Sequence, residues 1–407
     1  MNTSPKSFWT LFSRVTSSGT FIPEVDGLRF IAIFWVLAFH INGEYIKVMG
    51  SNFPGQIDDS LYTHVLHTWD FGVQLFFVIS GFILSLPFVR HYWGDAPKPR
   101  LGSYYLRRIT RIEPPYVINL LLFTLLLVVV KGPPIYQLLP HLLASLCYSH
   151  NLVYQSVSTI NFVTWSLEIE AQFYIAAPLL AFLFFNRSLR FRRVWLASII
   201  LASATLAWWL NNQFQVVHMT LLGQLPYFLA GFLLAAWYSQ STEVKISRSY
   251  LWDALGLLAW VVMLILLMHK SFSSTLALPF LVVGAYVCVF KGRIFGFILT
   301  RPAITTIGGM CYTIYLYHPF LKSALKHLLF PLRVSHLYWI NSAFQVCALG
   351  TAIILVAAVC FLLFERPFMF RNWPIKLFSY LKDWARPFAN SEPTGLFPIG
   401  KTGSQKD

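Results

Sequence analysis

The 407-residue sequence contains few charged side chains. Asp, Glu, Lys and Arg together make up 12% of it, whereas 57% is hydrophobic. This composition lies far outside the usual range for soluble domains. Because most residues fall in apolar runs, little chain remains for a separate soluble domain. The composition therefore predicts a single domain that uses the lipid bilayer as its solvent.

Cysteine is also scarce. The sequence has five cysteines and no Cys-x-x-Cys pair, and four of the five lie in apolar runs. This pattern argues against a zinc site and against a disulfide framework. We expect no metal ion and no permanently bound cofactor.

Ten apolar runs are long enough to cross the hydrocarbon core, which predicts an all-α, polytopic membrane protein. The predicted spans are 27–47, 70–90, 114–130, 165–185, 194–211, 219–238, 250–269, 275–290, 304–326 and 338–364. A weaker and more polar stretch at 138–154 is predicted to be re-entrant or interfacial, with an eleventh span as the alternative. Pro114 and Pro115 are consistent with the start of the third span.

The distribution of basic residues predicts the topology. The net charge is +15, but the Lys and Arg residues form short clusters between apolar runs, so nucleic-acid binding is not expected. With ten spans, most of these residues fall on the side that holds both termini, which the positive-inside rule assigns to the cytoplasm. An eleventh span would move the basic cluster at 187–193 outside. We therefore predict cytoplasmic segments at 1–26 and 369–407 that flank a lipid-embedded domain at 27–368.

Ionisable side chains within the first span are candidates for function, because such groups are costly in a membrane. Asp26 and Arg29 lie at its predicted cytoplasmic end, and His40 follows about 16 Å further along a helix. A histidine can serve as a general base that takes the proton from an attacking hydroxyl. The simpler alternative is a hydrogen bond from His40 to a neighbouring helix.

The fourth span begins with a polar sequence that contains two carboxylates. We expect Glu170 to lie at a depth similar to that of His40, where it would orient the imidazole as the acid of a triad does. Glu168 lies on a different helix face and is expected to be structural. The residues predicted to line a substrate cavity are Trp165, Ser166, Tyr174 and, from the ninth span, His318.

A basic cluster precedes the third span. Arg108 and Arg111 share a helix face and, with Arg107, are candidates for binding phosphate groups. The alternative is positive-inside charge combined with lipid headgroup contact. In the second span, Ser80 and Gly81 are interpreted as small residues that allow close helix packing.

Taken in order, these segments resemble the membrane acyltransferase family 3, the bacterial group that includes O-antigen, exopolysaccharide and macrolide O-acyltransferases. The resemblance spans nearly the whole chain. It is carried by DGLRFIAIFWVLAFH at 26–40, FFVISGF at 76–82, RRITRIEPPY at 107–116, WSLEIEAQFY at 165–174 and YLYHPF at 315–320.

By motif, Arg29 and His40 match the family's Arg-x10-His pair, and Arg108 and Arg111 match its Arg-x-x-Arg element. Glu170 matches the acidic residue after Trp-Ser-Leu, whereas Ala171 replaces the second acid that is usual there. These matches assign Asp26, Arg29, His40 and Glu170 to catalysis, and Arg107, Arg108 and Arg111 to the donor.

The resemblance implies an acyl-CoA co-substrate, often acetyl-CoA, and a glycan or lipid-linked saccharide as acceptor, in the bacterial cytoplasmic (inner) membrane. Membrane lipids are the other expected partners, and no oligomeric state is predicted. The main alternative is a transporter or flippase of a lipid-linked or acylated molecule, because ten helices with buried polar residues also suit a substrate pathway. That class favours repeated halves and broken helices, which the sequence does not suggest.

Overall fold

The computed structural model describes residues 8–14, 21–58, 60–186, 192–241, 247–370 and 373. Within these ranges the chain is helical, apart from loops and one isolated bridge between Ser249 and Gly292. Most of the predicted C-terminal tail at 369–407, and residues 1–7 and 15–20 of the predicted N-terminal segment, lie outside the described residues.

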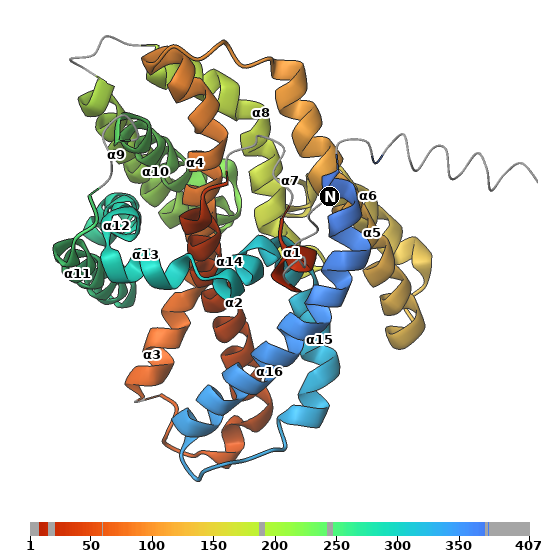
Figure 1. Cartoon of the computed structure of the whole chain (residues 1–407). Coiled ribbons are helices and arrows are strands. Elements are labelled where there is room, and N and C mark those ends of the chain that lie inside the picture. The colour runs from red at the N-terminus through yellow and green to blue at the C-terminus, as the bar shows by residue number, and fades with distance from the viewer. Residues whose placement is uncertain are drawn as a thin grey trace, which may run out of the picture.

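The long helices follow one another along most of the chain (Figure 1). They are α2 (Pro23–Met49), α4 (Gly72–Trp93), α5 (Leu101–Lys131), α8 (Trp165–Phe185), α9 (Arg192–Gln213), α10 (Leu221–Ser241), α11 (Tyr250–Met268), α12 (Phe272–Lys291), α15 (Cys311–Leu329) and α16 (Tyr338–Cys360). The shorter helices are α1 (Phe8–Phe12), α3 (Leu61–His67), α6 (Ile135–Leu146), α7 (His150–Tyr154), α13 (Arg293–Leu299) and α14 (Pro302–Gly309).

Within the described residues, eight helical stretches are long and apolar enough to cross a membrane. This confirms the prediction of an all-α, multi-pass membrane protein. Helices α2 and α15 coincide with two further predicted spans, but charged residues such as Arg29 and Lys322 lower their apolarity. The total of ten spans and the cytoplasmic location of both termini remain predictions.

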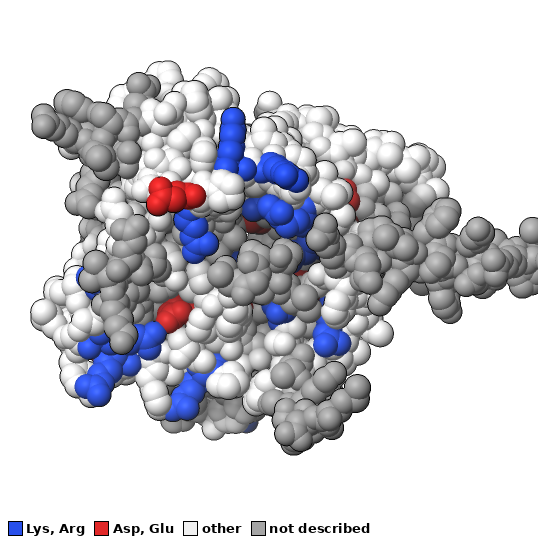
Figure 2. Space-filling view, turned by 45° about the horizontal axis from the view of Figure 1, so that its top comes forward, with Lys and Arg blue, Asp and Glu red and all other residues white. Residues whose placement is uncertain are grey.

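Lys and Arg side chains gather on the face of the molecule shown in Figure 2, with few acidic side chains among them. The end of α4 and the beginning of α5 lie at the top of Figure 1, which this view brings forward. The positive-inside rule assigns such a face to the cytoplasm. The predicted orientation therefore directs the beginning of α5 and its arginines toward the cytoplasm.

Helix α4 lies near the centre of the bundle and packs against α10, α8 and α2 (Figure 1). Glycines permit the closest of these contacts. A Cβ atom at Gly81 of α4 would overlap the carbonyl group of Phe228, and one at Gly231 of α10 would overlap that of Val78. Without side chains at these positions, the two backbones come into direct contact, as is common between membrane helices. The predicted packing role of Gly81 is thus supported by the geometry.

The predicted start of the third span at 114 is wrong, because α5 begins at Leu101 and continues through Pro114 and Pro115. Proline has no backbone N–H, so Pro114 leaves the carbonyl of Thr110 without its helical donor. The indole N–H of Trp373 donates to that carbonyl at 3.1 Å. This replacement bond helps α5 to continue from the segment that carries Arg107, Arg108 and Arg111 into its apolar part.

Two other segments differ in detail from their predictions. The predicted span 304–326 is interrupted at Met310, between α14 and α15, where Gly308 lies against the backbone of Asp26 in α2. The stretch 138–154 is divided between α6 and α7, which have 12 and 5 residues. Since about 20 helical residues are needed to cross the hydrocarbon core, neither helix forms an eleventh span.

Candidate active site

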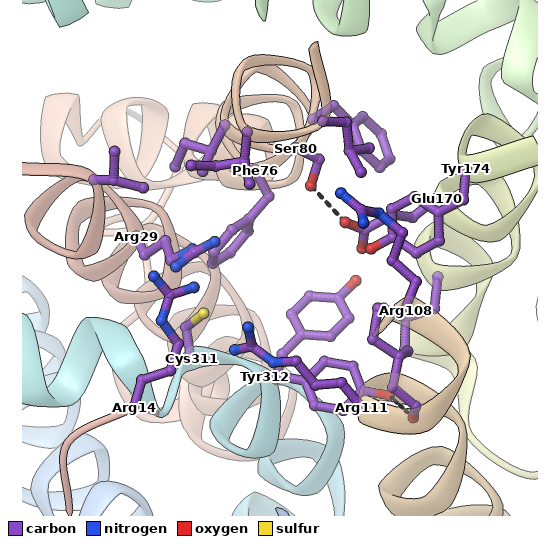
Figure 3. Close-up of a pocket in the computed structure, with 18 of the residues that line it drawn as sticks. Arg14, Arg29, Phe76, Ser80, Arg108, Arg111, Glu170, Tyr174, Cys311 and Tyr312 are labelled. Carbon is purple, nitrogen blue, oxygen red and sulfur yellow. Dashed lines mark hydrogen bonds between the residues drawn. The ribbon is translucent and has the colours of Figure 1, made fainter. Parts of the chain in front are cut away.

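A cavity of about 430 Å³ lies between α2, α4, α5, α8 and α15 (Figure 3). Its lining combines apolar side chains from these helices with a large group of polar ones. The polar lining residues are Arg14, Arg29, Ser80, Arg90, Arg107, Arg108, Arg111, Ser166, Glu170, Tyr174, Tyr312, Tyr315 and Glu365. Among the described residues, the lining thus has six arginines but only two carboxylates, which suits a ligand with several negative charges.

Asp26 and Arg29 form the part of the site contributed by α2. They lie three residues apart and therefore share a helix face. Arg29 Nη1 donates to Asp26 Oδ1 at 2.6 Å, and Arg14 Nη2 lies 3.5 Å from the same oxygen. The Asp26 side chain is 1% exposed. Asp26 therefore holds two guanidinium groups at the cavity wall without being part of the lining itself.

Arg108 is held in place by its own helix. Its guanidinium carbon lies 3.9 Å from the centre of the Tyr104 ring, and Nη1 donates to the Tyr104 carbonyl at 3.0 Å. The Nε atom is buried and has no hydrogen-bond partner among the described residues. Stacking on an aromatic ring restricts the side chain while its remaining N–H groups stay available to a ligand.

Arg111 projects into the cavity one turn further along α5, on the same side as Tyr312 (Figure 3). The Tyr312 hydroxyl donates to the carbonyl of Ile112 at 2.9 Å, which ties α15 to the same turn of α5. The predicted candidates Arg107, Arg108 and Arg111 all line this one cavity.

Glu170 faces the cavity from α8, beside Tyr174, which follows one turn later (Figure 3). Its Oε1 atom accepts a 2.5 Å hydrogen bond from Ser80 Oγ of α4. Ser80 therefore has a polar partner at the site, and the prediction that it serves packing is corrected. No sequence pattern indicates this bond, since a Ser-Gly pair in an apolar helix is typical of a helix contact.

His40 lies elsewhere, beside His318 of α15. The two ring centres are 5.1 Å apart, and the ring of Phe162 lies 5.3 Å from that of His40. No hydrogen bond joins His40 to Glu170, although both residues lie in the described part of the chain, and neither His40 nor His318 is in the cavity lining. The expected pairing of Glu170 with His40 is therefore not present, and the carboxylate bonds to Ser80 within the cavity.

His318 has a defined hydrogen-bond arrangement. Its Nδ1 lies 2.7 Å from the carbonyl oxygen of Tyr315, so Nδ1 carries the proton that is donated to this acceptor. The Nε2 atom is buried and has no partner among the described residues. Ser166, predicted with His318 as a cavity residue, shares a 2.7 Å hydrogen bond with the Tyr315 hydroxyl and lines the cavity.

Two residues at the start of α8, Trp165 and Glu168, lie outside the cavity lining. Trp165, predicted to line a substrate cavity, instead has ring contacts with Phe77 and His218 and is absent from the lining. Glu168 is fully buried, and its Oε2 accepts from the backbone N–H of Asn151 at 2.9 Å. That bond joins α8 to α7, as expected for a structural carboxylate.

Sequence reasoning missed Arg14, Arg90 and Glu365 as residues of the site. In the sequence, Arg14 and Arg90 belong only to the basic charge that predicts the topology. Glu365 ends a single π-helical turn at Phe361–Glu365, where its carboxylate accepts hydrogen bonds from the backbone N–H and the hydroxyl of Thr313. In the described residues no three His, Cys, Asp or Glu side chains are grouped to hold a metal ion.

Comparison with known proteins identifies the family. Residues 22–363 match a family model described as "Acyltransferase domain". A Staphylococcus aureus (strain COL) protein named "Putative O-acetyltransferase" is 24% identical over 328 residues, which cover 73% of this chain and 50% of that protein. "O-acetyltransferase OatA" of S. aureus (strain NCTC 8325) is 26% identical over 171 residues, 40% of this chain and 25% of that protein.

The chain thus spans at most about half the length of these curated relatives. No solved structure matches it. The family match nevertheless covers most of the sequence, including the helices that contribute Arg29, Arg108 and Glu170 to the cavity. The protein therefore belongs to the membrane acyltransferase family 3 and is a multi-pass membrane protein.

Proposed function

We propose that the protein transfers an acyl group, acetyl in the simplest case, from acyl-CoA to a hydroxyl of a glycan or lipid-linked saccharide. The donor enters from the cytoplasmic side and the acceptor hydroxyl approaches from the other side of the membrane. In this proposal the protein resides in the bacterial cytoplasmic membrane.

The excess of arginine in the cavity is the observation that supports this proposal most directly. Six arginines line the cavity together with two carboxylates. A phosphate monoester carries a charge of about −1.5 to −2 at neutral pH, and coenzyme A has such a group in addition to its diphosphate. Arginine binds phosphate oxygens through paired, charge-assisted hydrogen bonds. Arg107, Arg108 and Arg111, on adjacent turns of α5, are therefore our candidates for the donor's phosphates.

The position of His40 supports a division of the site into two parts. His40 lies about 16 Å beyond Arg29 along α2. With its phosphates near the arginines, the pantetheine arm of the donor extends toward His40 and delivers the thioester there. Arg29, held by its 2.6 Å ion pair with Asp26, then contacts the donor between these two ends.

The chemistry requires one base. His40 takes the proton of the acceptor hydroxyl as its oxygen attacks the thioester carbon. The new C–O bond forms, the C–S bond breaks, and the proton returns from His40 to the departing thiolate. The products are the O-acylated acceptor and CoA. Neighbouring His318 gives His40 a partly polar environment on the side of α15.

Glu170 takes a different role from the one inferred from the sequence. Its carboxylate is held by Ser80 and faces the arginine-lined cavity, so we assign it to the organisation of the donor site. Its negative charge also limits the mutual repulsion of the arginines.

The direct test is transfer of radiolabelled acetyl from acetyl-CoA to cell-envelope glycan. Membranes with wild-type protein are compared with membranes that contain His40→Ala at matched expression. Label that depends on His40 supports the proposal. No label above background, either with acetyl-CoA or with longer acyl-CoAs, contradicts it and favours the transporter alternative.

A further inference from the structure

Arg14 contributes to the cavity from outside the part of the chain that matches the acyltransferase family. The family match begins at residue 22, whereas Arg14 follows the short helix α1. Arg14 nevertheless lines the same cavity as Arg29 and Arg111. The N-terminal segment thus adds a cation that the family motifs do not contain.

The surroundings of Arg14 differ from those of a surface arginine. Its side chain is 10% exposed, and its buried Nε atom has no hydrogen-bond partner among the described residues. Its guanidinium group points toward that of Arg29 at the edge of the open space (Figure 3). Positive-inside topology alone does not require a basic side chain to be buried in this way.

The negative charge of Asp26 does not fully neutralise the positive charge of Arg14. The same oxygen of Asp26 lies 2.6 Å from Arg29 but 3.5 Å from Arg14, so one carboxylate serves two guanidinium groups. Burial, together with the positive charges of Arg29 and Arg111, lowers the pKa of Arg14 to about 9. At neutral pH the group is still protonated, and an anion in the cavity would stabilise that form.

We infer that Arg14 binds a phosphate group of the acyl-CoA donor, so that the N-terminal segment completes the donor site formed by Arg108 and Arg111. This inference rests on the proposed function, because it requires acyl-CoA to occupy the cavity. Arg14 acts in binding and takes no part in the transfer of the acyl group.

The test compares two donors with the purified full-length protein in lipid nanodiscs. Acetyl-CoA carries the phosphates, whereas acetyl-pantetheine has the same thioester and no phosphate. The variants are Arg14→Gln and Arg14→Lys. Arg14→Gln removes the charge, whereas Arg14→Lys keeps it but removes the planar guanidinium group. Arg301→Gln is the matched control, since Arg301 is exposed, stacks on Phe297 and lies outside the cavity lining.

If Arg14 binds phosphate, Arg14→Gln lowers kcat/KM for acetyl-CoA about tenfold to a hundredfold, mainly through KM. The kcat/KM of Arg14→Gln for acetyl-pantetheine stays essentially unchanged. Arg14→Lys retains part of the preference for acetyl-CoA. Arg301→Gln behaves as wild type with both donors. An equal loss with both donors assigns Arg14 to a structural role and overturns the inference while the proposed function stands. No effect on either donor overturns it as well. A wild-type protein that uses neither donor refutes the proposed function and this inference together.

Discussion

Ser80 of α4 donates a 2.5 Å hydrogen bond to the carboxylate of Glu170 of α8. This bond crosses between two helices that both line the arginine-rich cavity. It places the acid of the Trp-Ser-Leu motif within the arginine-rich cavity, apart from His40, whose neighbours are His318 and Phe162.

We expect Ser80→Ala to impair acyl transfer by weakening the position of Glu170. A hydrogen bond to a charged group contributes about 1.5–3 kcal/mol, so the rate should fall about tenfold to a hundredfold. Ser85→Ala is the matched control, because Ser85 is also buried in α4 but, within the described part of the chain, bonds to the Phe82 carbonyl and does not line the cavity. Equal activities of the two variants, measured by acetyl transfer at matched expression, would contradict a role for the Ser80–Glu170 bond.

Replacing Arg108 with lysine keeps the charge but removes the planar group that stacks on Tyr104. Because arginine and lysine are not equivalent at a stacked or bidentate site, we expect weaker binding of the donor. KM for acetyl-CoA should rise about tenfold or more, with a smaller change in kcat. Steady-state kinetics with varied acetyl-CoA give both constants. A lowered kcat at unchanged KM would place Arg108 in the chemical step instead.

The contact between α4 and α10 predicts a stability effect at Gly81. In Gly81→Ala the new methyl group meets the backbone of Phe228, which cannot move aside as a flexible side chain does. Overpacking of this kind costs about 1–3 kcal/mol. We expect a lower thermal midpoint of unfolding in detergent. Gly284→Ala in α12 is the control, since a Cβ atom there meets nothing within 4 Å, and a similar decrease in this variant would argue against a specific contact at Gly81.

Apolar run length predicted most of the helices, because a spanning helix must satisfy its backbone hydrogen bonds within itself. It could not predict the start of α5, since the replacement donor to Thr110 is Trp373, far away in sequence. Nor did it predict the break at Met310, where Gly308 is needed for the contact of α14 with α2.

The site was predictable to the extent that its residues lie in polar motifs within apolar spans or directly before them. Arg29, Arg108, Arg111 and Glu170 were selected in this way and line one cavity. Which side chains meet depends on helix rotation and depth, which run length does not determine. For this reason the sequence suggested that Glu170 pairs with His40, although its partner in the structure is Ser80.

In the proposed mechanism, donor binding and proton abstraction use different residues. The most direct measurement combines acetyl-CoA binding and acetyl transfer for purified wild-type protein and His40→Ala. Loss of a general base lowers the rate by a factor of about 10² to 10⁴. We predict a loss of this size with binding of acetyl-CoA unchanged, since His40 is not in the lining of the arginine-rich cavity. Substantial transfer by His40→Ala, or a parallel loss of acetyl-CoA binding, would contradict the claim.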